Sequence, residues 1–95
     1  MAETIGTVTN IKLATVDPGF PNPIDVGAVY LNETSTGITW LFYLWVSFAA
    51  DPAVNRVLQS QRLALVREAA FRNLTVHIFT DDVSNTAWQI TVDTP

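Results

Sequence analysis

Apolar and polar residues alternate along most of this 95-residue chain, and one stretch instead repeats with the period of a helix. Alternation with period two places successive side chains on opposite faces of a strand, whereas a helix groups residues three and four apart. The pattern predicts strands over residues 5–16, 26–32, 38–48, 74–80 and 86–92, and a helix over residues 52–72. We therefore expect a single domain, 1–95, that is mainly β with one helix, in the order β-β-β-α-β-β.

The stretch 38–48 is the most apolar of the predicted strands. Its even-numbered face is expected to lie in the core and consists of Ile38, Trp40, Phe42, Leu44, Val46 and Phe48. The odd-numbered face carries Leu41, Tyr43 and Trp45. Aromatic side chains with a polar edge suit a surface that meets a partner or a ligand. The odd face is therefore a candidate interface.

The first strand alternates imperfectly. Ile11 and Leu13 share one face, while Val8 falls on the other. An extra residue in a strand shifts the alternation by one position, so a bulge near Gly6 or Asn10 would bring these side chains to one face.

The helix begins at a capping Asp51 followed by Pro52, and Asn73 is its predicted end. One broad apolar stripe is expected to pack on the sheet: Val54, Val57, Leu58, Ala64, Leu65 and Ala69. A second, weaker stripe of Leu63, Val66 and Ala70 lies nearly opposite and is expected to face a partner. A charge at Leu65 should then unfold the domain, and a charge at Leu63 should only weaken assembly.

The composition also points to a second buried surface. Hydrophobic residues make up 48% of the chain and charged residues only 15%, although a chain this short has much surface to cover. An interface between identical subunits accounts for the excess. The predicted interface residues are Leu41, Tyr43, Trp45, Leu63, Val66 and Ala70.

The charge and the cysteine count exclude several classes of function. The net charge is −4 and Lys12 is the only lysine, which disfavours nucleic-acid binding. The absence of cysteine excludes disulfides and thiolate metal sites. The apolar run 38–48 has about half the roughly 20 residues that a membrane-spanning helix needs, so no membrane span is expected. The start lacks signal-peptide features, which indicates a cytoplasmic protein if this N-terminus is native and a secreted one if a signal was removed.

The candidate catalytic chemistry is sparse. His77 is the only histidine, and only Asp81 and Asp82 lie near it in sequence, so a surface histidine is favoured over a general base. The 81–85 turn lacks the spacing of a calcium loop. We expect no catalytic residue, no metal site and no cofactor, and a Glu68–Arg72 ion pair on the helix.

The element order resembles that of the OB fold, a five-stranded Greek-key barrel. A closer resemblance is to the receptor-binding subunits of five-subunit bacterial toxins of the Shiga and heat-labile enterotoxin class. It rests on the opening strand Gly-Thr-Val-Thr-Asn-Ile-Lys, 6–12, and on the passage from helix to strand over residues 55–80. The resemblance implies a pentameric ring whose helices line a central pore. This chain departs from those subunits in having no cysteine and no counterpart of their sugar-binding residues.

Two functional hypotheses follow. The first is a non-catalytic binding module: an oligomeric OB-like barrel, or a curled antiparallel sheet packed on one helix, with carbohydrate as the candidate ligand. Its candidate ligand residues are Tyr30, Tyr43, Trp45 and His77. The alternative is a structural or assembly protein, such as a phage or particle component, whose apolar faces serve self-association only.

Overall fold

The computed structural model describes residues 2–16, 24–48, 53–81 and 85–93. The elements appear in the predicted order: β1 (Ala2–Val16), β2 (Ile24–Glu33), β3 (Thr39–Phe48), α1 (Ala53–Arg72), β4 (Thr75–Thr80) and β5 (Ala87–Val92). The five strands form one sheet in the order β3-β2-β1-β4-β5, with every neighbouring pair antiparallel. The prediction of a mainly β fold with one helix is confirmed. The predicted helix cap at residues 51–52 lies outside the described residues.

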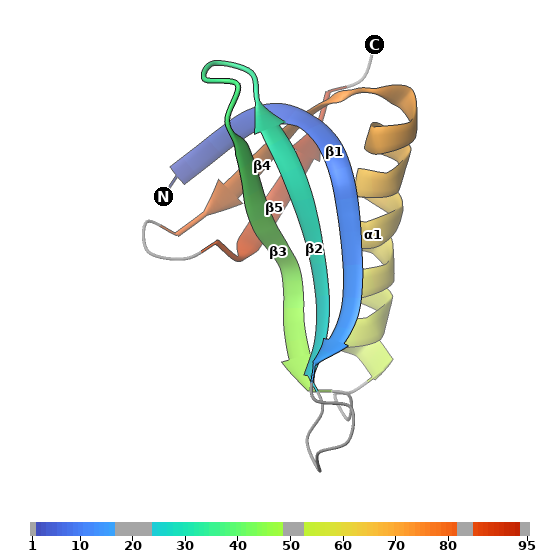
Figure 1. Ribbon diagram of the computed structural model, residues 1–95. Helices are drawn as coiled ribbons and strands as arrows, with labels where there is room; N and C mark the ends of the chain where they lie inside the picture. The colour runs from blue at the N-terminus through green and yellow to red at the C-terminus, as the bar shows by residue number, and fades with distance from the viewer. Residues whose placement is uncertain (1, 17–23, 49–52, 82–84, 94–95) are drawn as a thin grey trace.

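The long strand β1 joins the two halves of the sheet. Its first part, residues 2–7, pairs with β4, and its residues 6–16 pair with β2. Figure 1 shows β1 bending sharply between these two parts, so that β4 and β5 cross behind β2 and β3. The sheet is therefore strongly curled, and α1 lies along one side of it.

Gly6 sits where β1 changes partners, because it pairs with Val76 of β4 and with Glu33 of β2. A Cβ atom at this position would lie 2.0 Å from the backbone oxygen of Asn32. Neither backbone can move away without breaking its ladder, so the close approach requires glycine.

β1 contains a β-bulge shortly after Gly6. The pairing with β2 shifts between Val8 and Asn10, which leaves Thr9 as the extra residue. Val8 and Ile11 consequently both pack against the core, although three positions separate them. The predicted bulge near Asn10 is confirmed.

The curled sheet closes at only one point among the described residues. The backbone N–H of Tyr43 on β3 donates to the carbonyl oxygen of Asn85 at 2.8 Å, and Tyr43 forms a single parallel bridge with Thr86. No ladder continues from this bridge within the described strands. The architecture is thus an open, OB-like curled sheet with one helix packed on it.

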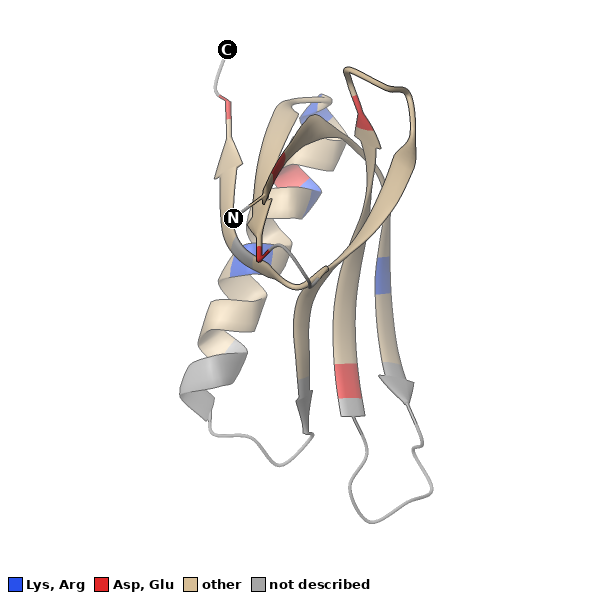
Figure 2. Cartoon of the chain, turned by 90° about the vertical axis from the view of Figure 1, so that its left-hand side faces the viewer, with Lys and Arg blue, Asp and Glu red and all other residues tan. Residues whose placement is uncertain are grey.

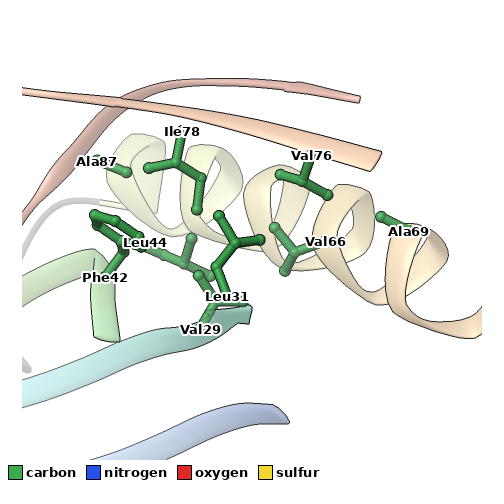
Figure 3. Packing of buried hydrophobic residues seen from close by; sticks show 9 residues of the cluster. All are labelled: Val29, Leu31, Phe42, Leu44, Val66, Ala69, Val76, Ile78 and Ala87. Carbon is green, nitrogen blue, oxygen red and sulfur yellow. The ribbon is translucent and has the colours of Figure 1, made fainter. Parts of the chain in front are cut away.

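The hydrophobic core lies between α1 and the inner face of the sheet, which we define as the face that α1 covers. Figure 3 shows Val66 pointing from the helix into a cluster of strand side chains, close to Leu31 and Val76. The buried cluster comprises Val29, Leu31, Phe42, Leu44, Val66, Ala69, Val76, Ile78 and Ala87. Side chains from every strand except β1 are fully buried in it, and β1 contributes Val8 and Ile11 at its edge.

The prediction that the whole even face of residues 38–48 is core holds for Phe42 and Leu44 but is wrong for three others: Ile38, Trp40 and Val46 are 49%, 44% and 53% exposed. The side chain of Phe48 lies outside the described residues. The exposure of Val46 is caused by a bulge: Gly27 of β2 pairs with Trp45, but Ala28 pairs with Tyr43, which leaves Leu44 as an extra residue. The extra residue reverses the alternation, so Leu44 and Trp45 both pack on the inner face and Val46 turns outward.

The helix packs differently from the prediction. Val66 is fully buried and Leu63 packs against the same cluster, although both were assigned to the weaker stripe. Ala69 of the predicted core stripe is fully buried, as predicted. Leu58 and Leu65, which were assigned to the core stripe, are 52% and 39% exposed. The buried face of the helix therefore combines Leu63 and Val66 of the weaker stripe with Ala69 of the predicted core stripe.

Polar contacts fix the helix in this orientation. Arg62 donates from Nη1 to the carbonyl oxygen of Leu44 at 2.8 Å, so the helix binds the bulged part of β3. The helix ends as predicted at Asn73, whose φ of 53° lies in the left-handed region. The N–H of Leu74 then donates to the Ala69 carbonyl at 2.9 Å, a bond that satisfies one of the last free carbonyls of the helix.

Replacing Gly6 by alanine tests the bend in β1. We expect Gly6→Ala to lower the free energy of unfolding by about 3 kcal/mol, the upper end of typical overpacking costs, because the clash is with backbone. Gly37→Ala is the matched control, since a Cβ there meets nothing within 4 Å and only its positive φ is penalised, by about 1–2 kcal/mol. Urea unfolding of both variants checks this; equal losses would contradict the crossing at Gly6.

The inward position of Trp45 has a separate test. A Cβ on Gly27 would lie 2.5 Å from Cη2 of the Trp45 indole. We expect Gly27→Ala to cost about 1–3 kcal/mol in the wild type but much less when Trp45 is also replaced by alanine. A double-mutant cycle of unfolding free energies measures this coupling. If the costs of the two substitutions simply add, the Trp45 indole does not lie against Gly27.

Candidate functional site

The structure does not bring the four predicted ligand residues together. Tyr30 and Tyr43 lie on the outer face of β2 and β3 and are partly buried. Trp45 lies on the inner face because of the bulge at Leu44. His77 is on β4, beyond β1 in the sheet. A single aromatic platform made of these four residues is therefore not formed.

Trp45 instead lines a hollow on the inner face, beside the last residues of β1 and the first residues of β2. Its indole lies against Gly27, whose missing side chain makes room for the ring. The hollow has a volume of about 320 Å³ and is lined by Leu13, Ala14, Asp25, Val26, Trp45 and Gln59. It therefore combines an aromatic ring with a carboxylate and an amide, on a mainly apolar floor.

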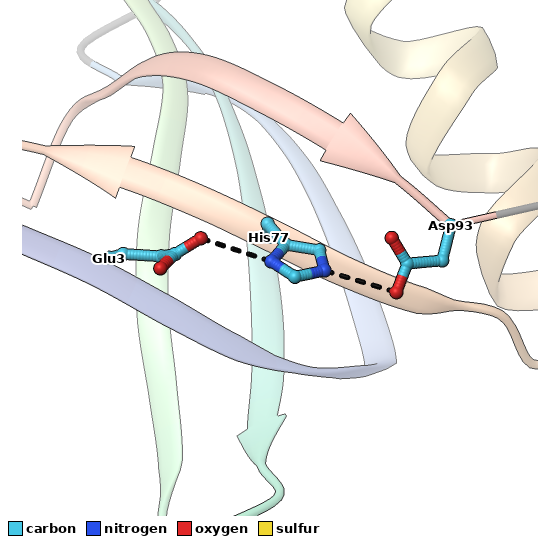
Figure 4. Close-up of polar contacts among 3 residues, drawn as sticks. All are labelled: Glu3, His77 and Asp93. Carbon is cyan, nitrogen blue, oxygen red and sulfur yellow. Dashed lines mark hydrogen bonds and ion pairs between the residues drawn. The ribbon is translucent and has the colours of Figure 1, made fainter.

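His77 is held between two carboxylates from segments far away in the sequence. Its Nδ1 atom lies 3.0 Å from Oε2 of Glu3 on β1, and its Nε2 atom lies 3.1 Å from Oδ2 of Asp93, which follows β5. Figure 4 shows the imidazole between the two acids, with β4 as the middle strand. The neighbours expected from the sequence, Asp81 and Asp82, are not its partners: Glu3 and Asp93 occupy both nitrogens, and Asp82 lies outside the described residues.

The two carboxylates raise the pKa of His77 above its ordinary value of 6.5. The hydrogen bond to Asp93 is the larger cause and the hydrogen bond to Glu3 the second, and both outweigh the opposing effect of partial burial. With a carboxylate on each nitrogen, the imidazole has no free nitrogen to receive a proton from a nucleophile. We define Glu3, His77 and Asp93 as the histidine clasp.

The charged groups are unevenly distributed. Figure 2 shows the basic residues mainly along the helix and the acidic residues mainly near strand ends. Glu3 of the clasp also lines a second hollow of about 340 Å³, together with Ile5, Glu33, Thr34 and Ser35. Glu33 is engaged there, accepting hydrogen bonds from Thr36 at 2.6 Å and from Trp40 at 3.3 Å.

The face of α1 that turns away from the sheet carries several large apolar side chains among polar ones. We call it the outer helix face; its large apolar members are Val57, Leu58, Leu65 and Phe71, and Phe71 is 91% exposed. Its described charges include Glu68 and Arg72, which form the predicted ion pair at 3.6 Å. This face, rather than the predicted stripe, is the candidate interface of the helix.

The predicted interface residues are placed differently. Val66 is fully buried and cannot contact a partner, and Leu63 packs against the core. Ala70 is only partly exposed on the same side of the helix. Leu41 and Tyr43 remain on the outer face of β3, whereas Trp45 has turned inward.

Two further findings concern the described part of the chain. No group of three or more histidine, aspartate or glutamate residues is placed to hold a metal ion there. The helix, within the same residues, lacks the sustained apolar length needed to cross a bilayer.

Sequence reasoning missed Glu3, Asp93 and Phe71. The two acids lie 74 and 16 residues from His77, and only the strand pairing brings them to it. Leu58 and Leu65 are seven positions apart and share one helical row, but Phe71 is six positions beyond Leu65 and lies about 120° around the helix from that row, so the row gave no signal for it.

A scan against protein-family models and searches of curated proteins and of solved structures found no match to this chain. The resemblance to toxin receptor-binding subunits therefore stays a hypothesis.

Proposed function

We propose that this protein is a non-catalytic subunit that works as a homo-oligomer, with the outer helix face as its self-association surface. The carrying observation is the exposure of Val57, Leu58, Leu65 and Phe71 on one side of α1. Exposed leucine and valine scattered singly would mean little, but these four side chains fall within an arc of about 140° around the helix, which one partner can cover.

The geometry of the outer helix face suits a second copy of the same helix. From Val57 to Phe71 the face is about 21 Å long, at 1.5 Å per residue. Its Glu68–Arg72 pair is internally neutralised, while Arg67 is a further exposed charge beside the apolar residues. Leu and Val side chains at this spacing pack as ridges between helices.

A ring with helices on the inside would follow from the resemblance to toxin subunits, and a pentamer is proposed on that ground alone. The curled sheet leaves α1 on one side of the molecule, where it can face neighbouring subunits. The same surface would equally support a particle or phage component, which is the alternative function.

Removing the apolar side chains of the outer helix face tests the proposal. We expect Leu58→Ser combined with Phe71→Ser to reduce the oligomer to smaller species, because both side chains are exposed in one subunit and are not needed for its core. Light scattering after size-exclusion chromatography measures the mass, and circular dichroism checks that the subunit stays folded.

Val46→Ser is the matched control, since Val46 is 53% exposed on the outer face of β3, away from the helix. It should leave the mass unchanged. A wild-type protein that is monomeric at micromolar concentration would refute self-association outright.

The Trp45 hollow supports carbohydrate as the ligand of such a subunit. Sugars are recognised by an aromatic ring that covers their apolar face and by polar groups that bond their hydroxyls. Trp45, Asp25 and Gln59 supply these groups around one hollow. This replaces the dispersed set of Tyr30, Tyr43, Trp45 and His77 as the candidate binding site.

A glycan array probed with the oligomeric protein tests this second proposal. We expect binding that Gln59→Ala weakens about tenfold, the loss of roughly 1.4 kcal/mol from one hydrogen bond. Tyr43→Phe, which alters the opposite face of the sheet, should leave binding unchanged. Absence of any hit at high valency would leave the assembly protein as the function.

A further inference from the structure

We propose that the histidine clasp is a pH-responsive latch: protonated His77 ties the start of β1 and the end of β5 to β4, and neutral His77 releases one of the two acids. This goes beyond the proposed function, since it concerns how one subunit holds its own strands. A single imidazole makes two short contacts, at 3.0 and 3.1 Å, to carboxylates on opposite sides.

The proton count of the imidazole makes the clasp sensitive to pH. A carboxylate in its ionised form only accepts hydrogen bonds, so each nitrogen of His77 must donate to hold its acid. The doubly protonated ring has two N–H donors and satisfies both acids. The neutral ring has one N–H, and its other nitrogen presents a lone pair to a carboxylate, which repels it. Loss of one proton therefore opens one side of the clasp.

The groups that face His77 come from both neighbouring strands. On the β1 side the charged group is Glu3, and on the β5 side it is Asp93; Ile5 and Thr91, directly opposite His77 in the two ladders, carry no charge. The helix contributes none, because it packs on the inner face with Val76 and Ile78 while His77 points outward. The clasp is thus one titrating ring between two acids, and its His77 side chain is 22% exposed, so protons can reach it.

The sign of the effect follows from the direction of the pKa. The folded protein holds the pKa of His77 above 6.5, mainly through its hydrogen bond to Asp93, whereas the unfolded chain has the ordinary value. The clasp therefore stabilises the fold fully below pH 6.5, and its contribution is lost as the pH rises through the raised pKa.

The latch acts on an edge of the sheet, where β5 is the last strand. Within the ladder, β5 pairs with β4 alone, and its end is held by the Asp93 N–H, which donates to the Thr75 carbonyl at 2.9 Å. On the other side, Glu3 also lines the hollow that contains Glu33. Opening of the clasp consequently loosens the end of β5 or frees Glu3 toward that hollow.

The experiment is an NMR titration of the full chain, in which the only histidine gives one imidazole signal. We expect a His77 pKa above 6.5 in the wild type, a lower value in Glu3→Gln and in Asp93→Asn, and the lowest in the double variant. Glu68→Gln, which removes an exposed acid on the helix, is the control and should leave the pKa unchanged. A wild-type value at or below 6.5, or one that neither variant alters, would overturn the proposal.

Hydrogen exchange separates a latch from a merely electrostatic pair. The protection factor of the Asp93 amide, corrected for intrinsic exchange, should fall between pH 6 and pH 8.5 in the wild type. The urea midpoint should fall over the same range. In His77→Gln, which keeps the N-terminal amine and every acid, both quantities should be independent of pH in this window. A shifted pKa with unchanged protection of Asp93 would refute the latch while leaving the ion pair in place.

Discussion

The fold depends on one strand being shared between two crossing layers. β1 pairs with β4 through its first residues and with β2 through the rest, and the two pairings overlap at Gly6 and Thr7. The backbones approach there so closely that only a hydrogen atom fits beside the Asn32 carbonyl. Since β3 attaches through β2 and β5 through β4, every other strand takes its position from this crossing.

Two bulges then decide which side chains reach the core. Thr9 is the extra residue in β1, and it places Val8 and Ile11 on one face. Leu44 is the extra residue in β3, and it turns Trp45 inward beside Gly27. Because side chains alternate with period two, one inserted residue exchanges the two faces of everything beyond it. The aromatic surface expected on β3 is divided in this way between the core and the outer face.

The proposed roles follow from the apolar side chains that this arrangement leaves exposed in one subunit and from the clasp that it brings together. The inner face buries Val66 and Ala69 of α1 and leaves Leu58 and Phe71 exposed, which suits contact with another helix. The clasp of Glu3, His77 and Asp93 works within a single chain and spans three strands. The two features lie on different faces of the molecule, so assembly and the latch can be tested independently.

Local signals in the sequence were sufficient to predict the five strands and the helix, and several details of these elements. Alternating residues defined the five strands, Asn73 marked the helix end, and the imperfect alternation of the first strand marked its bulge. These features depend on a residue and its immediate neighbours, because strand periodicity, the left-handed conformation of asparagine and the Glu68–Arg72 pair act over a few positions.

The tertiary structure alone decided which side of the helix packs on the sheet and which residues bind His77. Val66 and Leu65 are neighbours and both apolar, yet only Val66 is buried, because the turn of the helix against the sheet decides which of them meets the core. Glu3 meets His77 only because β1 crosses to β4. The sequence by itself determined local conformation, where the forces act between near neighbours. Packing and the clasp were decided by the crossing of β1, which joins residues that the chain keeps far apart.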